Sequence, residues 1–279
     1  QTKRNYVRGV GLVVILIASV VITGMAGFWS IDPVYFAERF RDFLVVISII
    51  YFIYLLLFAG LTANEKKNVL MLLLLFIGAA AFWSGFDQSA GSLTIFTRDY
   101  VNLTFGTFTA PVSWTQFVNP LFVVMFAPFF AYLWVFLGKR NLDPNMPIKF
   151  GLGLILMALG FIVMILAVKY ALASSPVGVQ WLLLTYLLHT FGELTLSPVG
   201  LSAFSKYSPK RYLGQMMGIW FLASSLGGVL AGLLGGEATE SGLESMSPVF
   251  TELVYYCLAI AAVLIVLSFF IKGAKTDNI

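Results

Sequence analysis

Charged residues are scarce in this chain: Asp, Glu, Lys and Arg together make up only 11% of its 279 residues. A soluble domain carries about 25%. Because 59% of the residues are hydrophobic and the mean hydropathy is +0.92, the composition excludes a soluble globular protein, a disordered chain and a nucleic-acid-binding protein. Cysteine is also nearly absent. The single Cys257 lies in an apolar run, which excludes an internal disulfide and a multi-cysteine metal site and predicts a small buried side chain.

Motifs of common enzyme classes are missing too. The sequence contains no phosphate-binding loop, no HExxH or GxSxG motif and no pair of acids that resembles a catalytic pair. The run His-Thr-Phe-Gly-Glu at 189–193 does not have the spacing of a zinc motif. We therefore expect no catalytic residues, no metal site and no bound cofactor.

Long apolar runs dominate the chain. A helix needs about 20 mostly apolar residues to cross a bilayer, and the connections between the runs are too short to fold as soluble domains. The sequence therefore predicts an all-α polytopic membrane protein with eight transmembrane helices. The eight predicted spans are 9–29, 42–62, 69–97, 114–137, 147–171, 178–204, 212–236 and 250–271.

Positive charge is distributed unevenly among the connections between these spans. Thirteen of the 17 cations fall on the side that holds residues 1–8, and four fall on the other side. Cytoplasmic connections of membrane proteins carry the excess of Lys and Arg. The sequence therefore predicts that both termini of the chain are cytoplasmic. The connection at 236–249, which carries three glutamates and no cation, is expected on the outer face.

Apart from charges at the ends of the predicted spans, two acids lie within them, Asp87 and Glu193, and no Lys or Arg lies in the middle of any span. An acid at the centre of a membrane helix costs about 2.5–3.5 kcal/mol, so acids at such positions usually serve a function. Removal from water favours the neutral form of a carboxyl group, which can then hold a proton and release it on hydration or on pairing with a cation. This behaviour suits a proton-coupled carrier. A carboxylate could also bind a substrate ammonium group, and a structural polar contact is the remaining alternative.

Polar residues recur along the span that contains Glu193. His189, Glu193 and Ser197 are four residues apart, so a helix places them along one face. Pro198 follows directly, removes a backbone donor and is expected to kink or break the helix as a hinge. Interrupted helices near the middle of the membrane mark binding sites in transporters. The alternatives are a Ser197 hydroxyl bonded one turn back and a structural His189 rather than a proton relay.

Three other positions are candidates for the same cavity. Trp83 and Asp87 are four residues apart on the third span and are expected to face one cavity, although an aromatic side chain can also serve packing alone. Asn119 precedes Pro120 on the fourth span, and a buried Asn must bond either a substrate or another helix.

Glycines on the seventh span predict close helix packing, because small residues four apart let two helices approach. They are Gly214, Gly218, Gly228, Gly232 and Gly236.

An ordered set of motifs resembles the proton-dependent oligopeptide transporter family, a branch of the major facilitator superfamily. The longest runs from Glu193 through Leu-Thr-Leu-Ser197-Pro198-Val-Gly-Leu-Ser, and continues with Met216-Met217-Gly218 and Trp220-Phe221-Leu222. Two shorter ones are Phe82-Trp83 with Phe86-Asp87-Gln88, and Trp114 with Gln116 and Asn119-Pro120-Leu121-Phe122.

The resemblance implies a domain organisation. Residues 69–279 are expected to form the C-terminal six-helix bundle of a major-facilitator fold, and residues 1–68 the accessory helix pair and linkers found in bacterial members. The N-terminal six-helix bundle is then absent from this chain. We expect that bundle to be its partner and to supply Arg or Lys to the shared cavity.

The resemblance also implies roles for single residues. In the family, the acid matching Glu193 and the serine matching Ser197 bind the amino end of the peptide, and the same acid takes part in proton coupling. The residue matching Asn119 contacts the peptide. The aromatic residues matching Trp220 and Trp83 line a side-chain pocket and the nearby cavity.

The acid matching Asp87 forms an outer-gate salt bridge with a cation of the N-terminal bundle. The implied function is proton-coupled symport of di- and tripeptides by alternating access, in a bacterial inner membrane, with the proton as the only coupling species. Three alternatives remain: the same fold carrying another solute such as nitrate or a drug-like molecule, an intramembrane enzyme, and a structural fragment that only binds partners.

Overall fold

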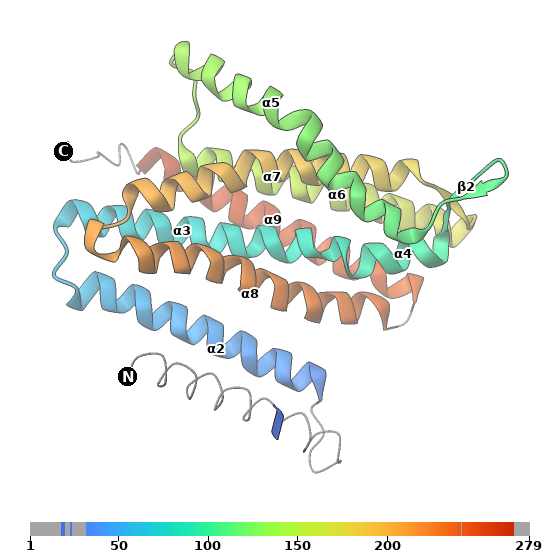
Figure 1. The fold of residues 1–279 in the computed structure, drawn as a ribbon, viewed down its shortest axis with the longest axis horizontal. Coiled ribbons are helices and arrows are strands. Elements are labelled where there is room, and N and C mark those ends of the chain that lie inside the picture. The colour runs from blue at the N-terminus through green and yellow to red at the C-terminus, as the bar shows by residue number, and fades with distance from the viewer. Residues whose placement is uncertain (1–17, 20–22, 24–31, 241, 271–279) are drawn as a thin grey trace, which may run out of the picture. The chain divides into compact units, whose positions relative to one another are not determined.

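A computed structural model describes residues 18–19, 23, 32–240 and 242–270 (Figure 1). The chain divides into two units, 1–39 and 40–279. α2 (Pro33–Ile53) starts at the end of the first unit and belongs to the second unit from Phe40 onward. It begins behind Asp32, whose Oδ1 accepts hydrogen bonds from the backbone N–H groups of Val34 and Tyr35 at 2.9 and 3.2 Å. Side chains such as Asp32 favour helix starts because they satisfy backbone donors that have no partner within the helix.

Helices make up nearly all of the second unit, which confirms the all-α fold class. α2 ends in a π-helical turn, η1 (Tyr54–Phe58). The other helices are α3 (Ala63–Phe86), η2 (Asp87–Ser89), α4 (Ser92–Tyr100), η3 (Val112–Phe117), α5 (Val118–Lys139), α6 (Met146–Ala173), α7 (Gln180–Tyr207), η4 (Lys210–Tyr212), α8 (Leu213–Thr239) and α9 (Leu243–Phe270).

Strands in the described residues are only two residues long. β1 (Val101–Asn102) pairs in parallel with β4 (Val177–Gly178), and β2 (Thr104–Phe105) pairs antiparallel with β3 (Phe108–Thr109).

Six helical segments of the described chain are long and apolar enough to cross a membrane, and α3 and α4 together count as one of them. The predicted span at 178–204 corresponds to α7, which is 28 residues long. Because α7 carries His189, Glu193 and several hydroxyl groups, it is less apolar than the others and is not among the six. The predicted span at 9–29 lies almost entirely outside the described residues. The total of eight transmembrane helices therefore stays a prediction.

Two helix starts show how the sequence fixes the ends of these spans. Thr62 and Glu65 form a capping box at α3, with Thr62 Oγ1 accepting from the Glu65 N–H (3.3 Å) and Glu65 Oε2 accepting from the Thr62 N–H (2.8 Å). At α6, Asn145 Oδ1 accepts from the Ile148 N–H at 3.1 Å, and Pro147 occupies the first turn, where its missing donor does no harm. Both starts lie at polar residues next to apolar runs.

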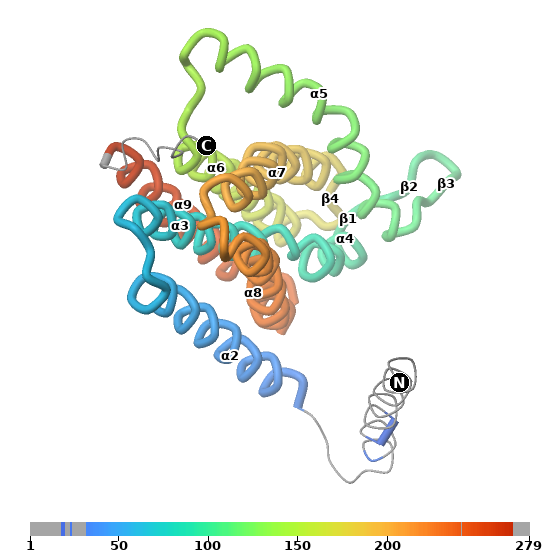
Figure 2. The backbone as a smooth tube through the Cα atoms, turned by 60° about the vertical axis from the view of Figure 1, so that its left-hand side comes forward, coloured from blue at the N-terminus to red at the C-terminus, as the bar shows by residue number. Residues whose placement is uncertain are grey.

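α6 packs between α7 and α9, and α3 packs along α8 (Figures 1 and 2). The close approach of α6 and α7 depends on two facing glycines. A Cβ atom added to Gly153 would lie 3.0 Å from the carbonyl oxygen of Gly192, and one added to Gly192 would lie 2.8 Å from that of Gly153. Cys257 is buried and has a free thiol, as the apolar run around it predicts.

The glycine contact between α3 and α8 differs from the one expected. It is formed by Gly227, where an added Cβ would lie 2.5 Å from Trp83 Cβ and 2.9 Å from the carbonyl oxygen of Ala80. The prediction of close packing was wrong for four of the glycines, because an added Cβ would meet no described atom within 4 Å. These are Gly214, Gly218, Gly232 and Gly236. The fifth, Gly228, has a different neighbour, described below.

Among the described α-helices of 20 residues or more, α5 has the fewest buried residues. Its first 13 residues contact α7, where the ring of Phe191 packs against Phe126 and Phe130 with centroids 5.0 and 5.3 Å apart. Figures 1 and 2 both show its C-terminal end diverging from α7. Large apolar side chains such as Val124 and Phe129 are exposed along it.

Candidate functional site

The helix that starts at Ala63 is interrupted at Asp87. α3 ends at Phe86, Asp87–Ser89 form a 3-10 turn, and α4 resumes at Ser92 after Gly91. The side chain of Gln88 is fully buried in this break. Its Nε2 donates to the carbonyl oxygen of Ala231 on α8 (2.9 Å), and its Oε1 accepts from the Ser92 hydroxyl (2.7 Å). The interruption is thus fixed to α8 and places a carboxylate where the helix ends.

A cavity of about 630 Å³ lies beside this break. It is bounded by α3, α7 and α8, and it brings together four of the predicted site residues: Trp83, Asp87, Ser197 and Trp220. Its lining residues are Trp83, Asp87, Ser197, Leu201, Trp220, Phe221, Ser224, Ser225 and Gly228.

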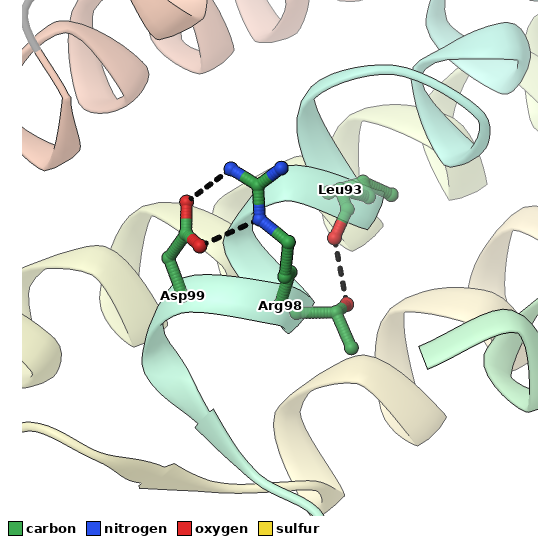
Figure 3. Close-up of polar contacts among 4 residues, drawn as sticks. Leu93, Arg98 and Asp99 are labelled. Carbon is green, nitrogen blue, oxygen red and sulfur yellow. Dashed lines mark hydrogen bonds and ion pairs between the residues drawn. The ribbon is translucent and has the colours of Figure 1, made fainter. Parts of the chain in front are cut away.

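Asp87 is half-buried and lies against α8. Its Oδ2 is 3.2 Å from where a Cβ of residue Gly228 would stand, so glycine leaves room for the carboxylate. Within the part of the chain that the structure describes, the carboxylate has no ion-pair partner. The cation of α4 is engaged elsewhere: Arg98 holds Asp99 through Nε–Oδ1 and Nη2–Oδ2 contacts of 2.7 and 2.8 Å (Figure 3).

Glu193 and Asn119 meet at the contact between α7 and α5. Asn119 Nδ2 lies 3.0 Å from Glu193 Oε2 and 3.0 Å from Thr190 Oγ1, so the amide donates to both. The Thr190 hydroxyl in turn donates to the carbonyl oxygen of Tyr186 (2.7 Å). Asn119 stands in the first turn of α5, where Pro120 is tolerated because the first backbone donors have no partner within the helix. The amide therefore binds one oxygen of the acid and leaves Glu193 Oε1 without a partner among the described residues.

His189 turns away from this cluster toward α6. It is buried, its ring packs on Phe161 with centroids 4.9 Å apart, and its Nε2 touches the position of a Cβ at Gly160. Nε2 has no hydrogen-bond partner among the described residues. Each step of four residues rotates about 40° around a helix, so His189 and Ser197 are about 80° apart. That rotation explains why Ser197 reaches the cavity and His189 does not.

Residues 13–244 match the sequence profile of the POT family. The chain belongs to this family. It is 37% identical to the peptide transporter YePEPT of Yersinia enterocolitica, a match that covers 94% of this chain and 53% of that protein. It is 34% identical to a di-/tripeptide transporter of Lactococcus lactis, over 81% of this chain and 46% of that protein. The chain spans about half the length of the curated relatives it matches.

Solved POT structures have the same fold. A crystal structure of the peptide transporter POT in complex with sulfate superposes with a TM-score of 0.83 at 30% identity, covering 99% of this chain and 54% of the other. A POT family transporter in complex with 5-aminolevulinic acid gives 0.81 at 29%, covering 97% and 55%. Family, fold and membrane-spanning helices together make the chain part of an integral membrane protein.

Trp220 and Pro198 are two further residues of this POT chain that the sequence predicted for the site, and one is buried while the other is exposed. Trp220 is 5% exposed, and its ring packs on Phe150 and Phe204 with centroids 6.4 and 5.4 Å apart, although the residue also lines the cavity. Gly200 makes room for that ring, since a Cβ there would overlap it. Pro198 is exposed, and α7 runs through it without a break, so its role as a hinge stays a prediction.

Sequence reasoning missed two polar residues of this site. Thr190 carries no signal of its own, because a threonine in an apolar run usually bonds the preceding turn, as this one also does. Gln88 had a signal: an uncharged amide next to Asp87 in an apolar span needs partners when buried. Its bond to Ala231, 143 positions away, could not be foreseen from the sequence.

Proposed function

We propose that this chain supplies one half of a proton-coupled symporter of di- and tripeptides that works by alternating access. The observation that carries the proposal is the half-buried Glu193, held through one oxygen by Asn119 while the other oxygen is free of described partners. A carboxyl group with one open oxygen can accept a proton or the ammonium end of a peptide. The names of the relatives, a peptide transporter and a di-/tripeptide transporter, support this substrate class.

A second helical bundle completes the cavity in this proposal. Two observations support it: the chain covers 53% of a relative's length, and Asp87 lacks a cation in the described part of the chain. A peptide also needs a cation for its carboxylate, and no Lys or Arg lies in the middle of a predicted span. The second bundle therefore contributes Arg or Lys, one of which pairs with Asp87 as an outer gate.

The cycle follows from these assignments. Peptide and proton enter from outside while Asp87 is unpaired. The peptide ammonium group binds near Glu193 and Ser197, Asn119 contacts the peptide, and Trp83 and Trp220 border its side chains. Protonation of Glu193 favours closure of the outer side, and the region around Pro198 then opens inward. His189 has no step in this cycle, because it is buried against α6 and does not line the cavity; its predicted role as a proton relay is tested by substitution.

The proposal places the protein in a bacterial inner membrane with both chain termini cytoplasmic, supported by the uneven distribution of cations and by the bacterial relatives. The proton is the only coupling species, and no enzymatic step is involved.

Each net positive charge that moves inward gains about 2.3 kcal/mol per 100 mV of membrane potential. Because about 1.4 kcal/mol corresponds to a tenfold ratio, this gain accumulates peptide by several tens of fold.

The test is uptake of a labelled dipeptide by proteoliposomes that contain the full-length transporter, with and without an inward proton gradient. We expect gradient-driven uptake that unlabelled di- and tripeptides suppress. Glu193→Gln keeps the shape of the side chain and should abolish the gradient dependence while the protein remains folded. Glu240→Gln, at the end of α8 and outside both clusters, is the matched control and should transport normally. Normal gradient-driven uptake by Glu193→Gln would remove Glu193 from the coupling role.

A second substrate class is supported by one relative, the POT family transporter in complex with 5-aminolevulinic acid. That molecule has an ammonium and a carboxylate group but no peptide bond. The same uptake assay discriminates: a solute of this kind that is taken up and not displaced by dipeptides would favour it.

A further inference from the structure

A second hollow lies between α2 and the bundle, and we call it the α2 groove. It has a volume of about 660 Å³ and shares no lining residue with the cavity that contains Asp87. α2 contributes Val45, Ile49 and Phe52 to its walls, and α3, α8 and α9 contribute mainly Leu, Ile, Phe and Ala. A groove with such walls in a membrane-spanning region accommodates hydrocarbon rather than water.

The described residues that line the interior of the α2 groove offer no unpaired polar group. The hydroxyl groups of Ser84 and Tyr256 bond each other at 2.5 Å, and Ser48 donates to the carbonyl oxygen of Leu44 at 2.7 Å. Selectivity for a ligand must therefore come from the rim.

Charged residues lie at one end of the groove. They are Arg41 of α2, Glu237 near the end of α8 and Glu252 of α9. Arg41 is already paired with Asp42, with Nη2 2.9 Å from Oδ1. The two glutamates are exposed, and their carboxylates make no ion pair or hydrogen bond within residues 32–240 and 242–270. The rim thus presents two unneutralised carboxylates beside a guanidinium group, which suits an ammonium group linked to a phosphate.

The length of the groove also fits a lipid. From Arg41 at the rim to Phe52 in the interior, α2 is an uninterrupted helix. At 1.5 Å per residue this distance is about 16 Å. The hydrocarbon core of a bilayer is about 30 Å thick, so the groove extends across about one leaflet.

We propose that the α2 groove binds a phospholipid whose head group carries a primary ammonium, as in phosphatidylethanolamine. One acyl chain lies along the apolar walls, the ammonium group donates hydrogen bonds to Glu237 and Glu252, and the phosphate lies near Arg41. The lipid comes from the leaflet at the α8–α9 connection. This inference depends on the chain lying in a membrane and is independent of the transported solute.

The test compares lipid binding by the full-length transporter in detergent, measured by native mass spectrometry. Phosphatidylethanolamine, phosphatidylcholine and phosphatidylglycerol with identical acyl chains are titrated separately. The quaternary ammonium of phosphatidylcholine has no N–H donor, so we expect phosphatidylethanolamine to bind about fivefold more tightly, as for one exposed ion pair. The double variant Glu237→Gln/Glu252→Gln should lose this preference.

Glu240→Gln/Glu244→Gln is the matched control, because it removes two acids of the same region that do not line the groove, and it should keep the preference. Thermal unfolding of both variants checks that they fold. Equal binding of the three lipids, tighter binding of phosphatidylglycerol, or a dimer of the protein in place of bound lipid would each overturn the proposal. Uptake is not measured, so failure here leaves the proposed transport untouched.

Discussion

Asn119 on α5 and Glu193 on α7 are joined by a hydrogen bond of 3.0 Å, although 74 positions separate them in the sequence. The same amide nitrogen also donates to Thr190, so both of its protons are used. One asparagine thereby fixes the orientation of the acid and ties α5 to α7. The acid of the proposed proton site and the most exposed helix of the bundle are linked through this single side chain.

Asn119→Ala should therefore affect both stability and transport. Removing the amide donor takes one hydrogen-bond partner from the half-buried carboxylate of Glu193 and one from the hydroxyl of Thr190. This loss lowers the free energy of unfolding by about 1–3 kcal/mol. We expect a lower unfolding temperature and at least a severalfold loss of gradient-driven uptake. Gln116→Ala, an exposed amide two residues before the start of α5, is the control and should change neither quantity. Wild-type uptake by Asn119→Ala would contradict the assignment.

Two glycine-to-alanine substitutions on α8 test which of its glycines the close packing of helices requires and which it does not. A Cβ at Gly227 would lie 2.5 Å from Trp83 Cβ and 2.9 Å from a carbonyl oxygen of α3. Gly227→Ala should thus push α3 from α8 and lower the free energy of unfolding by about 1–3 kcal/mol. At Gly232 an added Cβ meets no described atom, so Gly232→Ala should be neutral or stabilise the helix by up to about 1 kcal/mol. Thermal unfolding measures both, and equal effects would argue against this packing.

His189→Leu tests whether the buried imidazole moves protons or only packs. The ring contacts Phe161 and Gly160 and does not line the cavity that contains Asp87. We expect the variant to unfold at a lower temperature, because a leucine fills the flat space less well. The pH dependence of dipeptide uptake should keep its midpoint. A shifted or lost pH dependence in folded protein would instead assign His189 to the proton relay.

Lys149 near the start of α6 is 8% exposed, and its charge is balanced by one acid. Its Nζ lies 2.8 Å from Asp143 Oδ1 and 4.4 Å from the centre of the Trp134 ring. Asp143→Asn leaves the buried ammonium unpaired and should destabilise by about 2–4 kcal/mol. Lys149→Met removes the buried charge itself, keeps the apolar stem, and should destabilise less. The order of the two unfolding temperatures is the measurement, and the reverse order would contradict this account.

The positions of most spans followed from length and apolarity alone, because crossing a membrane demands long apolar helices with internally satisfied backbones. The break at Asp87 did not follow, since the predicted span at 69–97 contains no proline and the turn is held by Gln88 through a partner on α8. For the site, the sequence predicted that Trp83 and Asp87 face one cavity, and both line the cavity that Ser197 and Trp220 also line.

The sequence did not predict that Glu193 and Asn119 lie outside the lining of that cavity. It also did not predict that the side chain of His189 points toward α6. Both depend on how α7 rotates against its neighbours. The advance of about 40° with every four residues separates His189 from Ser197 around α7. Interhelical contacts, such as Gly153 with Gly192, fix which side of α7 faces α6.

The two hydrogen bonds of the Gln88 side chain have a consequence for conformational change. They join the interruption after α3 to α8 and to the start of α4. We therefore expect Asp87 and Gly228 to move together when the conformation changes. α5 contacts the described part of the bundle mainly along α7, so we expect it to move relative to the other helices about the contact between Asn119 and Glu193.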